Sequence, residues 1–197
     1  MEKKLEKIKQ QVIECTKCEL SQTRNNSVAG KGNFKADVIF VGEAPGKNED
    51  LKGEPFIGIA GKKLSIALES AGITREEVYI TNIVKCRPPK NRVPTSIERE
   101  TCQNYLKKEI EIIEPKIICI LGNTAFSSLL DGKEITKFRG KVVSKNNQLY
   151  FLTVHPAATI YNQKLIDVLK KDMKKLFKLI KELKDKKKIK IDIEYTS

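Results

Sequence analysis

Four short apolar runs each end in a polar or glycine-rich segment, and this repeated pattern constrains the fold more than any other feature. The runs begin at residues 36, 78, 117 and 150, and they lead into Glu43, Asn82, Asn123 and His155. Short β-branched runs that alternate with longer helical patterns are typical of a parallel sheet. Because ligands of open α/β sheets bind beyond the carboxyl ends of the strands, we expect these four side chains to converge on one crevice.

The pattern as a whole predicts an α/β fold, in which helices flank a central, mainly parallel four-stranded sheet as an α/β/α sandwich. Thr95 and Glu98 have the spacing of a capping box at the start of a helix. Asn146-Asn147 joins two segments typical of a hairpin, 141–144 and 148–154. Helical spacing indicates helices over 2–14, 62–70, 95–114, 123–130 and 164–183, with loops at 21–35 and 86–94.

The length of 197 residues fits one domain. We expect this domain to cover residues 1–184 and to be followed by a Lys-rich tail over 185–197, with a short strand near 189–193. No apolar run reaches the length of a membrane span, and the charged N-terminal pattern differs from a signal peptide. We therefore expect a cytoplasmic, intracellular protein without a membrane partner.

The chain is strongly basic, with 38 Lys and Arg against 25 Asp and Glu and a net charge of +13. Residues 163–197 carry +6 of this charge, and the rest of the chain carries +7. A basic surface suits a polyanionic partner. Surfaces rich in Lys and Glu also occur in proteins of thermophiles, so charge alone does not separate the two explanations.

Four of the five cysteines are candidate metal ligands. Cys15 and Cys18 form a C-x2-C pair that follows a helix, whereas a redox pair normally follows a strand. Cys86 and Cys102 could complete a four-thiolate site, and the alternative is that these two are ordinary cysteines. Spacing does not separate zinc from an iron–sulfur cluster. Cys119 lies in an apolar strand and is expected to be a buried hydrophobe.

The segment Gly42–Lys47 lacks the spacing of a phosphate-binding P-loop. A loop this rich in Gly and Pro nevertheless lets a ligand approach the backbone closely. His155 is the single histidine of the chain and lies just after a strand and before a proline. A structural and a functional role for it are equally compatible with this position.

Three ordered motifs resemble the family 4 uracil-DNA glycosylases. They are residues 42–61, residues 81–92 and residues 155–158, and the four cysteines fall at the family's cluster-ligand positions. The resemblance covers roughly residues 10–180. Many members have glycine where this chain has Ala44, whose methyl group could narrow the floor of the pocket.

The resemblance implies a DNA-repair enzyme that acts on single- or double-stranded DNA. It would flip uracil out of the stack and hydrolyse the N-glycosidic bond, leaving an abasic site without a lyase step. Phe56 would stack on the base, Asn82 would pair with its edge, and His155 would donate to O2 as negative charge develops. Gly42 and Ala44 would complete the uracil site.

The resemblance also implies roles for residues around the pocket. Asn91, with Glu49 nearby, would position the attacking water, and Glu43 would act at the pocket mouth in a role that the motifs do not define. A 4Fe-4S cluster with a structural role would bind Cys15, Cys18, Cys86 and Cys102. The implied DNA contacts are a phosphate site at Gly122, Asn123 and Thr124 and a minor-groove turn with Ala157, Ala158 and the wedge Ile160.

We expect a monomer associated with the nucleoid, and the resemblance leaves open a replication clamp as a further partner. Two other functions also stay open. One is a related glycosylase of broader base specificity, which would act on hypoxanthine or mismatched thymine. The other is a non-catalytic DNA-binding module with a structural zinc site.

Overall fold

The computed structural model of the chain describes residues 1–195, so residues 196–197 of the expected tail lie outside the described residues. The elements follow in this order: α1 (Glu2–Ile13), α2 (Leu20–Thr23), β1 (Lys31–Gly32), β2 (Val38–Gly42), α3 (Lys47–Lys52), α4 (Ile59–Glu69), η1 (Arg75–Glu77), β3 (Tyr79–Asn82), η2 (Pro89–Asn91), α5 (Ser96–Ile113), β4 (Ile117–Leu121), α6 (Asn123–Leu130), α7 (Ile135–Phe138), β5 (Val142–Lys145), β6 (Gln148–Thr153), α8 (Ala158–Tyr161), α9 (Lys164–Lys184) and β7 (Ile193–Tyr195).

The described strands form one sheet in the order β1-β3-β2-β4-β6-β5-β7. Its centre, β3-β2-β4-β6, is parallel throughout and confirms the predicted four-stranded core. The expected number of strands was too low, because β1, β5 and β7 extend the sheet to seven strands. β1 spans two residues, which is too short for a hydrophobic period to reveal it. β5 is the first arm of the predicted hairpin, and β7 lies at Ile193–Tyr195, mostly beyond the short strand expected near 189–193.

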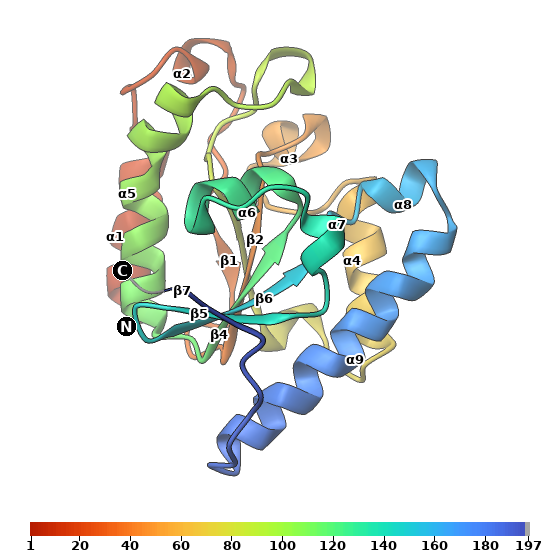
Figure 1. Cartoon of the computed structure of the whole chain (residues 1–197). Helices are drawn as coiled ribbons and strands as arrows, with labels where there is room; N and C mark the ends of the chain where they lie inside the picture. The colour runs from red at the N-terminus through yellow and green to blue at the C-terminus, as the bar shows by residue number, and fades with distance from the viewer. Residues whose placement is uncertain (196–197) are drawn as a thin grey trace.

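The sheet is covered on both faces, as expected for an α/β/α sandwich. Strand β2 alternates between the faces: Ile39 and Val41 pack in a cluster with α1, α5 and α6, whereas Val38 and Phe40 pack in a cluster with α4 and α9. Figure 1 shows α1 and α5 on one side of the sheet and α4 and α9 on the other. No helix among residues 1–195 is both long and apolar enough to cross a bilayer.

Two local sequence signals are confirmed. The Thr95 hydroxyl accepts from the backbone N–H of Glu98 at 3.2 Å, and the Glu98 carboxylate accepts from the Thr95 N–H at 2.8 Å, so a capping box starts α5. Asn146 and Asn147 both have positive φ, at 51° and 62°. Two such residues form the tight turn that joins paired strands, here β5 and β6.

The carboxyl ends of the parallel strands lie at one edge of the sheet. Gly42 of β2 pairs in register with Asn82 of β3, and Leu121 of β4 pairs with Thr153 of β6. Figure 1 shows α3, α6 and α8 gathered around this end. The fold therefore brings the loops that follow all four central strands to one place.

Candidate active site and cysteine cluster

A cavity of about 520 Å³ lies beyond the carboxyl ends of the strands. Glu43, Asn82 and His155, which follow or end three different strands, all line it. This volume is within the usual range for small-molecule sites, about 300–1,000 Å³. Two larger depressions, of about 610 and 820 Å³, are lined by neither Asn82 nor His155. The predicted convergence therefore holds for three of the four strand-end side chains.

Phe56 lines this cavity with its backbone in the left-handed region, at φ 53°. The loop that carries it is held by Arg75, whose guanidinium donates to the carbonyl oxygens of Phe56 at 2.8 Å and Pro55 at 3.0 Å. A side chain at Gly42 would place its Cβ 2.5 Å from both the Phe56 ring and Asn82 Oδ1. Glycine at position 42 therefore lets the aromatic ring and the amide share one wall.

Asn82 lines the cavity and carries an unsatisfied acceptor. Its residue is 1% exposed, and its Oδ1 atom is buried without a hydrogen-bond partner among the residues that the structure describes. A buried polar atom left unpaired costs about 1–3 kcal/mol. Such an atom in a cavity wall indicates a ligand that brings a donor.

His155 is held as a neutral hydrogen-bond donor. The backbone N–H of Ala157 donates to its Nδ1 at 3.1 Å, so the proton of the neutral ring lies on Nε2. Burial lowers the pKa of His155 to about 4, from an ordinary value of 6.5. The His155 ring lies 5.8 Å from the Phe56 ring, centroid to centroid. Gly122, at φ 89°, has no side chain and so leaves room for the Cβ atom of His155. At neutral pH, His155 therefore offers one N–H.

Glu49 is buried in the cavity wall and has two differently placed oxygens. Its Oε1 accepts from the backbone N–H groups of Ile57 at 2.9 Å and Gly58 at 2.7 Å. No hydrogen bond from residues 1–195 reaches its Oε2. Glu49 thus secures the loop after Phe56 with one oxygen and leaves the other for a further donor.

Asn91, Glu43 and Ala44 also line the cavity, as predicted. Asn91 is exposed, has φ 56°, and accepts from Arg87 Nε through its Oδ1 at 2.7 Å. The Glu43 carboxylate accepts a short hydrogen bond from the Thr124 hydroxyl. This contact joins the loop after β2 to the first turn of α6.

Of the two segments expected to contact DNA, the turn over 157–161 lines the cavity, whereas Gly122, Asn123 and Thr124 do not. Ala157 and Ile160 line it, and Ile160 and Tyr161 are 41% and 91% exposed. Asn123 does not line the cavity, because its Oδ1 accepts from the backbone N–H of Ile135 at 2.7 Å. Gly122 is the N-cap of α6, and Ala158 begins α8.

The four candidate metal ligands pack against one hydrophobic cluster, with Cys86 and Cys102 buried and Cys15 and Cys18 half-buried. Arg24 donates to Cys86 Sγ at 3.0 Å, and the backbone N–H of Lys85 donates to Cys102 Sγ at 3.2 Å. Burial raises the pKa of Cys102 to about 12, Lys85 opposes the rise, and Cys86 and Cys15 add to it.

The four thiols have the ligand chemistry of a metal centre. Within residues 1–195, no three Cys, His, Asp or Glu side chains converge closely enough for one metal ion. Four thiols, two of which accept from N–H donors, have the donor chemistry of an iron–sulfur cluster, which is larger than one ion. Cys119 is fully buried in β4, as predicted for a small hydrophobe.

Several residues that shape the site were missed from the sequence. Arg75 holds the Phe56 loop. The only sequence pattern near it is the capping box of Thr74 and Glu77, which predicts the start of η1 but not this contact. Tyr161 lines the cavity mouth beside Ile160. Asp172 of α9 accepts from the Thr153 hydroxyl at 2.7 Å and so holds the strand that leads to His155.

Comparisons with known proteins agree with this geometry. Residues 29–184 match the family model described as the Uracil DNA glycosylase superfamily. The type-4 uracil-DNA glycosylase of Sulfurisphaera tokodaii is 48% identical over 89% of this chain and 84% of the relative. Those of Archaeoglobus fulgidus and Saccharolobus solfataricus are each 44% identical, over 89% and 95% of this chain and 92% and 90% of the relatives. The chain therefore belongs to the type-4 uracil-DNA glycosylase family, within the uracil DNA glycosylase superfamily.

Proposed function

We propose that this chain flips uracil out of DNA and hydrolyses its N-glycosidic bond, leaving an abasic site for base excision repair. Its relatives at 44–48% identity carry the name type-4 uracil-DNA glycosylase. The observation that carries the proposal is the buried, unpaired Oδ1 of Asn82 in the same cavity as the N–H donor of His155.

Asn82 reads the edge of the pyrimidine. Uracil has a donor at N3 and an acceptor at O4, whereas cytosine has an acceptor at N3 and a donor at N4. Asn82 Oδ1 accepts from N3–H, and its NH2 group donates to O4. Cytosine would face this amide with both polarities reversed, and a site built on hydrogen bonds discriminates strongly against such a mismatch.

His155 acts on the charge that develops when the glycosidic bond breaks. The leaving uracil becomes an anion, and part of its charge lies on O2. The Nε2–H of His155 donates to this oxygen, and the Nδ1 contact with Ala157 holds the required tautomer. A preorganised donor of this kind contributes about 2.7–4 kcal/mol to the transition state.

Glu49 and Asn91 are the candidates for positioning the attacking water. We favour Glu49, because its Oε1 is fixed by two backbone N–H groups while no hydrogen bond from residues 1–195 reaches its Oε2. Asn91 is exposed, and its Oδ1 is already used by Arg87. Glu43 shapes the mouth of the cavity through its contact with Thr124.

The DNA strand crosses the cavity mouth between the turns of α6 and α8. Ile160 enters the minor groove as a wedge, supported by its exposure and its place on the rim. The adjacent residues Ala157 and Ala158 let the backbone approach. A phosphate contacts the N–H groups of Asn123 and Thr124 at the start of α6. The N–H of Gly122, expected in the same site, instead donates to the Thr153 carbonyl at 3.1 Å. The net charge of +13 favours the polyanion.

Cys15, Cys18, Cys86 and Cys102 hold a 4Fe-4S cluster. When bound, this group ties the segment after α1 to the segment after β3 and contributes stability. The proposal rests on the donor chemistry of the four thiols and on the match to type-4 relatives. The chain works as a monomer at the nucleoid, and a replication clamp is a further candidate partner.

The test of the proposed function is the release of free base from oligonucleotides in single turnover. Matched strands carry uracil, hypoxanthine, cytosine or a thymine opposite guanine. We expect release from the uracil strand alone, with the abasic strand left uncut. Release of hypoxanthine or thymine at a similar rate would support the broader glycosylase, and binding without any release would support the non-catalytic module.

A further inference from the structure

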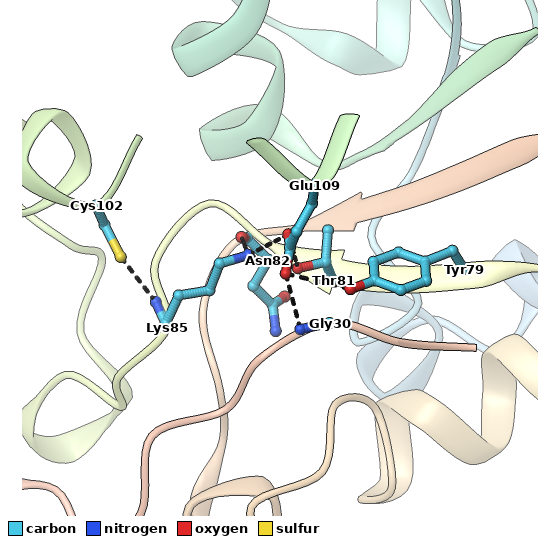
Figure 2. Close-up of polar contacts among 7 residues, drawn as sticks. All are labelled: Gly30, Tyr79, Thr81, Asn82, Lys85, Cys102 and Glu109. Atoms are coloured by element: carbon cyan, nitrogen blue, oxygen red, sulfur yellow. Dashed lines mark hydrogen bonds and ion pairs between the residues drawn. The ribbon is translucent and has the colours of Figure 1, made fainter. Parts of the chain in front are cut away.

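A buried ion pair lies directly behind the residue proposed to read uracil. The side chains of Lys85 and Glu109 are each 1% exposed, and Lys85 Nζ lies 2.7 Å from Glu109 Oε2. Lys85 follows β3, and Glu109 comes from the C-terminal part of α5. Figure 2 shows the ammonium group between Glu109 and the backbone oxygen of Asn82, with the side chain of Asn82 extending away from it.

The three protons of the Lys85 ammonium group match three acceptors. They are Glu109 Oε2 at 2.7 Å, the Thr81 hydroxyl at 2.5 Å and the Asn82 carbonyl at 3.0 Å. Glu109 in turn accepts from the Thr81 hydroxyl at 2.9 Å and from the backbone N–H of Gly30 at 3.0 Å. The pair is thus fully hydrogen-bonded at the end of β3.

Stability alone does not explain an ion pair in this position. Removing two charges from water costs several kcal/mol per ion, and replacing a buried pair with uncharged residues is often neutral or stabilising. A buried pair can instead fix one particular arrangement of the backbone. Here the arrangement that it fixes includes Asn82.

The backbone around Asn82 is held from two sides. Lys85 binds the Asn82 carbonyl, and the next residue, Ile83, donates its N–H to the Gly42 carbonyl at 2.9 Å. The Asn82 Oδ1 atom, in contrast, has no partner within residues 1–195. Because the protein does not orient this amide oxygen directly, its direction depends on the backbone beneath it.

We infer that the Lys85–Glu109 ion pair is a positioning device that sets the Asn82 amide for uracil, and this inference rests on the proposed function. The pair acts through Asn82 and does not touch the base, since neither residue lines the cavity. The backbone N–H of Lys85 also binds Cys102 Sγ. The same residue therefore holds the base-reading strand against the cysteine-bearing helix α5.

The test removes both charges together, because removing one would leave the other buried and unpaired. In the double variant Lys85→Met/Glu109→Gln, the amide of residue 109 can still accept from Gly30 and donate to Thr81. The backbone N–H to Cys102 is unchanged, so we expect iron content and thermal midpoint near those of the parent protein. Single-turnover uracil release should be about 10- to 100-fold slower, the scale of loss from a misplaced positioning group.

A double-mutant cycle with Asn82→Ala separates positioning from general damage. If the pair acts through Asn82, removing its charges in the Asn82→Ala background should change the remaining rate by less than about twofold, the scatter of independent sites. A control, Lys116→Met/Asp37→Asn, removes the ion pairs of Asp37 with Lys116 at 2.6 Å and with Lys184 at 2.7 Å. Asp37 and Lys116 lie at the amino ends of β2 and β4, away from the cavity at the carboxyl ends. We expect this control to leave uracil release unchanged in both backgrounds.

The inference is overturned if the double variant releases uracil at the parent rate, or if the rate falls equally in the two backgrounds. If the double variant does not fold, Thr81→Val enters the same cycle, since it removes the bridging hydroxyl and keeps both charges. We then expect a loss of about 3- to 10-fold that again disappears without the Asn82 amide. A parent protein that releases no uracil would instead refute the proposed function, which distinguishes the two failures.

Discussion

Replacing His155 with Ser removes the donor assigned to uracil O2 and tests whether that donor acts on the transition state. The structure holds Nε2–H as the donor, because Nδ1 accepts from Ala157 at 3.1 Å and burial keeps the pKa near 4. A serine side chain is too short to reach the same position. The expected loss is that of one preorganised donor, about 2.7–4 kcal/mol or 10²- to 10³-fold in rate.

Single-turnover release from a uracil oligonucleotide measures this loss, and equilibrium binding of the same DNA is measured in parallel. Because the charge on O2 exists only in the transition state, the rate should fall far more than the affinity. Equal losses in rate and affinity, or no loss in rate, would refute the assigned role.

The pH dependence gives a second readout of the same residue. A neutral donor predicts no inflection near pH 6.5 in the rate profile, and NMR of this single histidine should show a pKa near 4. The unfolded chain binds a proton near 6.5 while the folded chain does not, so stability should fall as pH decreases from 6.5 to 4. The loss, relative to His155→Ser, should reach roughly 3 kcal/mol. An imidazole that titrates near 6.5 would contradict the buried, neutral donor.

Three further predictions concern base choice, the cysteines and the tail. Asn82→Asp should lose most uracil release, because a carboxylate cannot donate to O4 and the lost hydrogen bond costs roughly 1–3 kcal/mol. Weak cytosine release is expected in its place, and a parent-like rate on uracil would refute the assignment. Protein purified anaerobically with ample iron should be brown, Cys86→Ser should lower its iron content, and Cys119→Ser should leave it unchanged; stoichiometric zinc would count against the cluster. A chain ending at Lys184 lacks β7, which pairs only with the outer strand β5 among the described strands. Base release should therefore persist, and DNA binding should still weaken steeply with salt. Complete loss of release would assign the tail to the active site.

The parts of this fold that follow from local pattern were predictable from the sequence. The capping box of Thr95 and Glu98, the Asn146-Asn147 turn and the apolar segments of the four central strands each depend on residues close together in the chain. The carboxyl-end rule then brings Glu43, Asn82 and His155 to one cavity without knowledge of any contact. The specific role of each residue came from the resemblance.

The missed features depend on residues far apart in the sequence. Glu109 lies 24 residues from Lys85, and a lysine just after a strand has the sequence appearance of an ordinary surface residue. Asn123 has a strand-end position like that of Asn82, but its amide is used by Ile135, twelve residues later. Strand position predicts where a side chain starts, whereas its hydrogen-bond partners depend on the packed structure.

A crystal structure of the chain with free uracil tests the central claim most directly. The account predicts uracil in the cavity with its ring against Phe56, N3 within hydrogen-bond distance of Asn82 Oδ1, and O2 within hydrogen-bond distance of His155 Nε2. The amide oxygen that has no partner within residues 1–195 would then have one. A saturating uracil concentration that leaves the cavity without the base, or a bound base that leaves Asn82 Oδ1 unpaired, would contradict the account.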